Sequence, residues 1–256
     1  MFSGEWVSGL NSNLVQHIVS VSHLLYTKGF VSATDGNVSA RLENGNFLTT
    51  RSGINKGTVI EEDILEVDIH GNIVIGSQQS AISTSKPSTE IGMHLFIYKN
   101  RPDVNAVVHA HPVYATGFAA ARQPLVSCVF PEVIVGLGAI PLAEYATPST
   151  EEVAQSLAPY VNSADAILLA NHGVVTYGKD IWDAYYKMEK VEHAAQITFV
   201  ARMLGGEKRL TREEVEKLSA ISNQSYGKDF SQKISCVKDA ASSEDTLSLV
   251  RQMLRG

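Results

Sequence analysis

Cysteine, basic charge and long apolar runs are all scarce in this sequence of 256 residues. Its two cysteines, Cys128 and Cys236, are too few and too far apart to indicate a disulfide framework or a cysteine-rich zinc site. The formal net charge of -6 lacks the basic footprint typical of nucleic-acid-binding proteins. No apolar run reaches membrane-spanning length, and we expect no secretion signal at the first residues. These absences favour a cytoplasmic protein without a nucleic-acid or membrane partner.

Hydrophobic residues, in contrast, make up 44% of the sequence and recur with regular periods. Helical spacing predicts helices over residues 14–25, 88–103 (with Ser88 as N-cap), 112–122, 149–161, 181–204, 210–227 and 242–256. Alternating and β-branched runs predict strands within residues 34–42, 47–53, 64–69, 72–76, 105–111, 125–130, 139–145, 166–170 and 173–178. This mixture favours helices on both faces of a mixed sheet. We expect one domain over residues 1–205, with residues 206–256 as its helical C-terminal extension.

Two histidines close the apolar strand in the stretch NAVVHAHP. His109 and His111 are two residues apart, so their side chains project from the same face of a strand and can converge on one ion. A third histidine, His172, follows another buried strand in the stretch ANHG, and Glu90 lies at the start of a helix in the stretch KPSTE. Histidine nitrogens and carboxylate oxygens are typical ligands of zinc. The four residues therefore predict a metal site.

The other histidines are assigned no role in this site. His94 lies four residues after Glu90, and we interpret it as a helix-surface residue in preference to an outer partner of the metal site. The remaining histidines are His70 in a turn and His17, His23 and His193 on helices.

The stretches KPSTE, VVHAHP and ANHG, in this order and spacing, resemble the class II aldolase/adducin family over about residues 10–205. The resemblance implies a three-layer α/β/α fold with a largely antiparallel central sheet, a homotetramer with active sites between subunits, and a divalent metal. That metal is usually Zn²⁺, with Mn²⁺ or Co²⁺ as alternatives. By motif match, His109, His111 and His172 are the metal ligands, and Glu90 contacts the metal at rest and then acts as acid and base. A glutamate at this position argues against the family's epimerases but does not separate aldolases from decarboxylases.

Three polar stretches are candidates for binding a phosphate group. Taken alone, each is an ordinary loop rich in hydroxyl side chains and glycine. The resemblance implies that the phosphate-binding residues are Asn37, Ser52, Gly53, Ser88 and Thr89. Arg51 either reinforces this anion site or points to solvent, and the sequence leaves both possibilities open.

One position departs from the family pattern. Phe130 stands where aldolases of this family carry a tyrosine that donates a proton, and a phenyl ring has no proton to give. Tyr226 matches a C-terminal tyrosine that reaches a neighbouring active site in the family, and Tyr114 is close in sequence to His111. These three residues are accessory candidates.

The resemblance favours a retro-aldol cleavage of a ketose 1-phosphate to dihydroxyacetone phosphate and an aldehyde through a metal-stabilised enediolate. Phe130 favours a deoxy or methylthio pentulose 1-phosphate. Two alternatives stay open: a metal-dependent decarboxylase of a phosphorylated oxo-acid, and a non-catalytic adducin-like interaction module. A Schiff-base mechanism is not expected, because no lysine is predicted in the desolvated setting that lowers its pKa.

Overall fold

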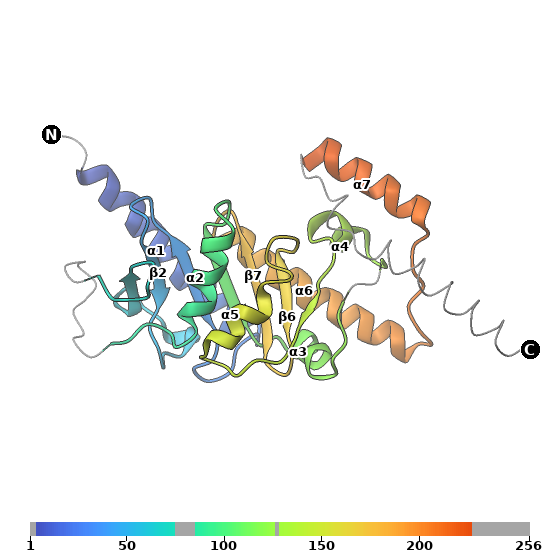
Figure 1. The fold of residues 1–256 in the computed structure, drawn as a ribbon, viewed down its shortest axis with the longest axis horizontal. Helices are drawn as coiled ribbons and strands as arrows, with labels where there is room; N and C mark the ends of the chain where they lie inside the picture. The colour runs from blue at the N-terminus through green and yellow to red at the C-terminus, as the bar shows by residue number, and fades with distance from the viewer. Residues whose placement is uncertain (1–3, 75–84, 126–127, 227–256) are drawn as a thin grey trace, which may run out of the picture.

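The structure is a computed structural model that describes residues 4–74, 85–125 and 128–226 (Figure 1). Seven strands form one sheet in the order β3-β2-β1-β4-β7-β6-β5. Their bounds are β1 (Asn37–Arg41), β2 (Phe47–Thr50), β3 (Ile64–Val67), β4 (Ala106–Ala110), β5 (Leu142–Ala143), β6 (Ala166–Leu169) and β7 (Gly173–Gly178). Neighbouring strands run antiparallel except β5 and β6, which are parallel. The prediction of a mixed, largely antiparallel sheet is confirmed.

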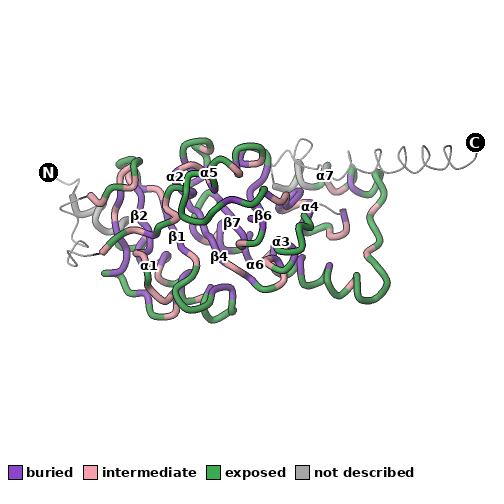
Figure 2. The backbone as a smooth tube through the Cα atoms, turned by 60° about the horizontal axis from the view of Figure 1, so that its bottom comes forward, coloured by how far each residue is buried: buried purple, intermediate pink, exposed green. Residues whose placement is uncertain are grey.

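Helices cover both faces of this sheet and make three layers (Figure 1). One face is covered by α1 (Gly4–Thr27), α3 (Val113–Ala120) and α6 (Ile181–Met203), and the other by α2 (Ile91–Asn100) and α5 (Glu151–Leu157). Because side chains alternate along a strand, Val108 enters the core on the first face and Val107 the core on the second. Figure 2 shows the strands as mostly buried backbone between the two layers of helices.

A smaller unit lies beyond the sheet, where α7 (Arg212–Tyr226) packs on α4 (Pro131–Gly136). Its core contains Ile134 and Val215. The helix predicted over residues 210–227 is confirmed as α7, whereas the described part of the strand predicted over residues 125–130 forms no strand. Leu125 makes an isolated bridge to Ile140, and Pro131 then opens a helix because its fixed φ suits a first helical position. The predicted helix over residues 242–256 lies outside the described residues.

Cys128 is disulfide-bonded and 4% exposed. The other cysteine of the sequence, Cys236, lies outside the described residues. Among the helices that the structure describes, none combines the length and apolar character that crossing a membrane requires.

Candidate active site

His109 and His111 lie where β4 ends, beside β1. His109 pairs with Asn37 of β1 and its side chain is fully buried. Its Nδ1–H donates to the carbonyl of Val174 at 2.9 Å, so its Nε2 atom is turned toward the site. This outer hydrogen bond fixes the ring orientation, as it does for many histidines that bind metals. His111 follows the strand, and its backbone N–H donates to the carbonyl of Phe30 at 2.8 Å.

The turn between β6 and β7 brings His172 to the same place. Asn171 takes a left-handed conformation with φ of 56°, which lets the chain reverse within the three residues between β6 and β7. Gly173 then passes so close to β4 that a Cβ atom would lie 2.5 Å from the His111 ring and 2.6 Å from the carbonyl of Ala110. A larger residue would push the two histidine-bearing segments apart, so glycine is required in the stretch ANHG.

Glu90 completes the group, which we call the histidine–glutamate cluster: His109, His111, His172 and Glu90. The Glu90 oxygens lie 3.3 Å from Nε2 of His109 and 3.1 Å from Nε2 of His172. The Nε2 atoms of His109 and His111 are 3.1 Å apart. Ligand atoms about 2.0–2.1 Å from a zinc ion are about 3.3 Å apart in a tetrahedral site. The donor set and its spacing therefore fit a metal such as zinc.

Glu90 is not inside the helix predicted for this segment, because α2 begins at Ile91 and Glu90 is its N-cap. Ser88, expected as the N-cap, lies in the preceding turn, where its Oγ accepts a hydrogen bond from the Glu90 N–H at 3.3 Å. The predicted N-cap was two residues too early. A serine whose side chain accepts a hydrogen bond from the backbone N–H two residues later is typical of turns as well as of helix N-caps, and here Ser88 makes this bond in the turn before α2. Asn37 donates from Nδ2 to Glu90 Oε2 at 3.0 Å, which ties the carboxylate to β1.

The members of the histidine–glutamate cluster shift one another's pKa values. Burial alone would raise the pKa of Glu90, but the charge and hydrogen bonds of His109 and His172 hold it well below its ordinary value. Burial lowers the pKa of His109, yet Glu90 outweighs this effect and raises it. Burial and the two neighbouring histidines lower the pKa of His111 to about 3. The carboxylate is therefore ionised and His111 is neutral, which is the form that binds a metal.

His94 is fully buried, so its interpretation as a helix-surface residue was wrong. Its Nδ1 atom lies 2.7 Å from Oγ of Ser39, and burial lowers its pKa to about 3. The error arose because α2 is apolar on nearly all sides, so its periodicity did not show which side faces the sheet.

Three of the five phosphate-binding candidates line one cavity of about 630 Å³: Ser52, Ser88 and Thr89. Arg51 lines this cavity too, and its guanidinium pairs with the buried carboxylate of Asp63. The other two candidates do not line it. Asn37 bonds Glu90 as described, and Gly53 lies in the adjoining loop with φ of +71°.

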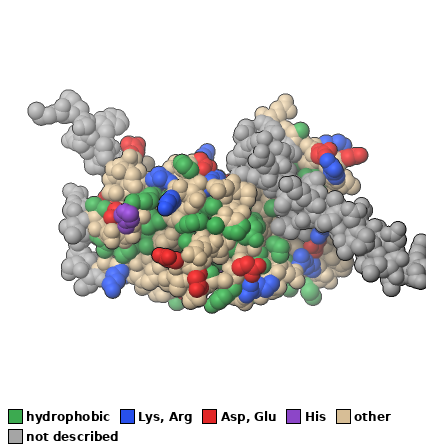
Figure 3. All heavy atoms as spheres, viewed as in Figure 1, with side chains coloured by type: hydrophobic (Ala, Val, Ile, Leu, Met, Phe, Trp, Pro, Cys, Tyr) green, Lys and Arg blue, Asp and Glu red, His purple; other side chains and the backbone are tan. Residues whose placement is uncertain are grey.

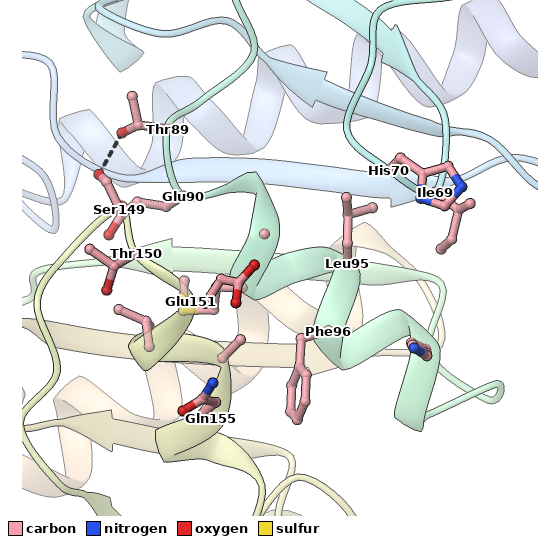
Figure 4. A pocket seen from close by; sticks show the side chains of 15 residues that line it. Ile69, His70, Thr89, Glu90, Leu95, Phe96, Ser149, Thr150, Glu151 and Gln155 are labelled. Carbon is pink, nitrogen blue, oxygen red and sulfur yellow. Dashed lines mark hydrogen bonds between the residues drawn. The ribbon is translucent and has the colours of Figure 1, made fainter.

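A second cavity of about 670 Å³ lies between α2 and α5, and Thr89 and Glu90 are part of its wall (Figure 4). At its rim, Ser149 Oγ donates to Thr89 Oγ1 at 2.8 Å. Figure 3 shows apolar side chains gathered over the middle of this face of the molecule. Glu90 can therefore be approached from the side of α5 as well as from the histidines.

None of the described contacts joins an accessory candidate to the histidine–glutamate cluster. The Tyr114 ring lies against that of Phe199, with centroids 5.6 Å apart and planes tilted by 59°, and Phe130 packs against the core beneath α4. Tyr226 is the last residue of α7, and its side chain lies outside the description.

Two residues near the site were missed by the sequence interpretation. Asp35 places Oδ2 3.6 Å from Nδ1 of His111. Lys56 is 1% exposed, and its Nζ donates to the carbonyls of Ile54 at 2.8 Å and Thr34 at 3.4 Å. Burial lowers the pKa of Lys56 to about 8 against the opposing charge of Asp35. The expectation that no lysine is desolvated was therefore wrong.

Comparison with known proteins fits this geometry. The model of the family described as Class II Aldolase and Adducin N-terminal domain matches residues 16–199. The chain belongs to this family. L-fuculose phosphate aldolase of Methanococcus maripaludis is 37% identical over 75% of this chain and 98% of that protein. A solved structure of L-fuculose 1-phosphate aldolase superposes with a TM-score of 0.73 at 33% identity, covering 82% of this chain and 95% of the other.

A relative with a different name is also similar. The 3-oxo-tetronate 4-phosphate decarboxylase of Pectobacterium atrosepticum is 30% identical over 79% of this chain and 90% of that protein. Membership of the class II aldolases makes the chain a metal-dependent carbon–carbon lyase. The possibility of a non-catalytic interaction module, left open by the sequence, is thereby set aside.

Proposed function

We propose that this protein cleaves a ketose 1-phosphate to dihydroxyacetone phosphate and an aldehyde, with Zn²⁺ as its metal and Mn²⁺ or Co²⁺ as substitutes. The observation that carries the proposal is the convergence of the histidine–glutamate cluster: the ligand atoms of its three histidines lie within 4.8 Å of one another, and three pairs of ligand atoms in the cluster are 3.1–3.3 Å apart. Two similar proteins named as fuculose phosphate aldolases support this reaction.

In this proposal His109, His111 and His172 hold the metal, with Glu90 as the fourth ligand at rest. The bound ion would supply Lewis-acid stabilisation of the enediolate that forms when the C3–C4 bond breaks. In the direction of synthesis, Glu90 accepts the proton from the carbon of dihydroxyacetone phosphate that becomes C3. In cleavage it returns the proton to that carbon. The ionised state of Glu90 leaves its carboxylate able to accept a proton, as the role of base requires.

The phosphate group is proposed to bind at Ser52, Gly53, Ser88 and Thr89, with Asn37 at the side nearest Glu90. Three of these residues share one cavity, and the backbone amides that open α2 lie directly after them. Hydroxyls and helix-opening amides are favourable donors to a phosphate dianion.

The aldehyde end of the substrate is proposed to be poor in hydroxyl groups, as in a deoxy or methylthio pentulose 1-phosphate. The reason is Phe130, which offers no proton donor where the family pattern has a tyrosine. Comparing kcat/KM for fuculose 1-phosphate with that for a deoxypentulose 1-phosphate tests this point. Full activity on the first substrate and none on the second would reject it.

We also propose a cytoplasmic homotetramer with sites between subunits. Apolar side chains at the end of α6 support an interface there: Phe199, Val200, Met203 and Leu204 are 46–83% exposed. A phosphorylated substrate supports the cytoplasm, because such metabolites do not cross membranes unaided. Sedimentation analysis at micromolar concentration should give four chains per particle, and a stable monomer would contradict the assembly.

The decisive experiment is an assay of the Zn²⁺-loaded protein against a panel of ketose 1-phosphates, with dihydroxyacetone phosphate detected by a coupled dehydrogenase. The proposal predicts its release from at least one member. Parallel incubation with phosphorylated 3-oxo-acids tests the second candidate function, decarboxylation, which the Pectobacterium relative favours. Carbon dioxide release without dihydroxyacetone phosphate would replace the aldolase proposal by this one.

A further inference from the structure

Polar side chains join α2 to β1 in register, on the face of the sheet that α2 covers. Residues two apart on β1 meet residues four apart along the segment formed by Glu90 and α2. The three rungs, which we call the α2–β1 ladder, join the side chains of Asn37 and Glu90, the side chains of Ser39 and His94, and the Arg41 guanidinium to the backbone carbonyl of Tyr98. Their donor–acceptor distances are 3.0, 2.7 and 2.8 Å.

The ladder is possible because two different repeats have almost the same length. Four residues of an α-helix rise about 6 Å, and two residues of an antiparallel strand rise about 6.8 Å. A helix lying along a strand can therefore present one polar residue per rung for three rungs before the mismatch separates the partners. The rungs fix one position of α2 along β1.

The middle rung is the most buried and the most connected. Ser39 and His94 are both fully buried, and Oγ of Ser39 also lies 2.8 Å from the hydroxyl of Tyr98. The Tyr98 ring stacks on Phe47 with centroids 4.6 Å apart, so the surroundings are apolar. Burying a hydroxyl and an imidazole there is costly unless both are bonded. Their directional bonds set a distance and an angle, which apolar contacts between helix and sheet do not.

The first rung joins Asn37 to Glu90, whose carboxylate is the proposed base. Glu90 caps α2, so a slide of α2 along β1 carries its backbone with it. Such a slide would lengthen and misalign the bond between Ser39 and His94 and would displace the Glu90 oxygens from their places at 3.3 and 3.1 Å from His109 and His172.

We propose that Ser39 and His94 are positioning residues, which set α2 along β1 and thereby hold the Glu90 carboxylate against His109 and His172. Glu90 can then turn at its side chain while its backbone stays in place. The inference rests on the metal-dependent activity of the protein and not on the identity of its sugar phosphate.

The test uses variants that remove or rebuild the middle rung. Ser39→Ala and His94→Leu each remove it, and His94→Asn offers an amide near the place of Nδ1. Thr176→Val is the matched control, because Thr176 is equally buried and its hydroxyl donates to the carbonyl of Ala184 in α6 at 2.8 Å, away from Glu90.

Two measurements separate positioning from mere stability. We expect Ser39→Ala and His94→Leu to lower kcat about 10- to 100-fold, with KM within about threefold and one metal per chain retained. His94→Asn should recover most of kcat, and Thr176→Val should stay within about twofold of the parent. In Co²⁺-loaded protein, the visible absorption band reports the ligands of the ion, and it should shift in the two rung-breaking variants only.

The proposal would be overturned if folded, metal-loaded Ser39→Ala retained kcat and an unchanged Co²⁺ spectrum. It would also be overturned if Thr176→Val lost as much kcat as Ser39→Ala, since the effect would then be one of general stability. Should His94→Leu fail to fold, Ser39→Ala and the conservative Ser39→Thr form the deciding pair. Absence of turnover in the parent would contradict the proposed function, whereas the Co²⁺ spectra would still report on the ladder.

Discussion

Two clusters of buried polar side chains lie at opposite ends of the sheet, and their hydrogen bonding differs. The histidine–glutamate cluster lies where α2 begins and β4 ends. The other, which we call the charged network, lies where α2 ends and β7 ends, and it consists of Arg101, Asp103, Asp165, Asp183 and Lys187. In this network Lys187 Nζ has three acceptors: Asp165 at 3.2 Å, Asp183 at 3.0 Å and the carbonyl of Tyr177 at 2.9 Å.

The difference separates a structural cluster from a reactive one. The three N–H bonds of the Lys187 ammonium are all used, and Arg101 is likewise bonded to two carboxylates and two carbonyls. At the other end, buried atoms without a hydrogen-bond partner among the described residues include Asn37 Oδ1 and His94 Nε2. Such atoms are costly to bury unless a ligand uses them. The comparison predicts that mutations at the first end remove activity and that those at the second end remove stability.

The largest effect is expected from removing a histidine of the cluster. His172→Ala should lose bound metal and lower kcat/KM by more than about 1,000-fold, because the remaining ligands no longer surround the ion. Metal analysis and dihydroxyacetone phosphate release measure the two losses together. His193→Ala, on the exposed side of α6, is the control and should match the parent. Turnover by metal-free His172→Ala would contradict the proposed chemistry.

A large but narrower effect is expected from Glu90→Gln. Three histidines remain to hold the metal, and the amide oxygen can still accept from Asn37, so the metal content should stay near one per chain. The loss of the base should lower kcat about 10²- to 10⁴-fold. It should also stop the exchange of the C3 proton of dihydroxyacetone phosphate with deuterium from solvent, which proton NMR detects. The exposed Glu213→Gln on α7 is the control, and wild-type exchange in Glu90→Gln would reject Glu90 as the base.

How well each cluster could be predicted depends on how local its geometry is. The direction of His109 and His111 follows from two residues of strand, and that of His172 from one turn, so the sequence was sufficient to bring them together. The burial of His94 depends on which side of an almost wholly apolar helix faces the sheet, and the burial of Lys56 on loops around Thr34 and Ile54. Burial that depends on how distant segments pack is not encoded in the periodicity of the local sequence.

The fold shows the same division. Long periodic elements such as α6 and the β6–β7 hairpin were predicted, because each has a pattern that only one secondary structure fits. The run over residues 125–130 was misread as a strand, since a short apolar segment has no distinctive period. Pro131 was the signal that a helix follows, through its preference for the first turn.

Lys56 sharpens the comparison, because it is a buried lysine near the reactive end that bonds carbonyls and not carboxylates in the described contacts. Its folded pKa of about 8 is below the ordinary value of 10.5. The unfolded chain therefore binds more protons than the folded one between these values, and stability rises with pH from about 8 to 10.5. Lys56→Met should remove this rise, by up to about 3 kcal/mol, in urea unfolding measured across that range. An unchanged pH slope would show that Lys56 is not the cause.

The same lysine tests the Schiff-base alternative. Because Nζ of Lys56 is engaged by Ile54 and Thr34, we expect no imine with the substrate. Borohydride added with dihydroxyacetone phosphate should leave the mass of the protein unchanged, and loss of activity in Lys56→Met should be limited to about tenfold through loosening of the two loops. A reduced adduct on Lys56 would overturn the metal-based proposal.

The smallest effect on activity, and the largest on stability, is expected at the charged network. Lys187→Met leaves the carboxylates of Asp165 and Asp183 buried with fewer donors, so the free energy of unfolding should fall by about 3–5 kcal/mol. The kcat of the folded protein should stay within about twofold, since every partner of Lys187 lies at the far end of the sheet from Glu90. Arg212→Met is the matched control: its pair with Glu216 is exposed and should cost less than about 1 kcal/mol. Loss of kcat in Lys187→Met without loss of stability would contradict this separation. It would mean that the charged network influences Glu90 through α2, which extends from one cluster to the other.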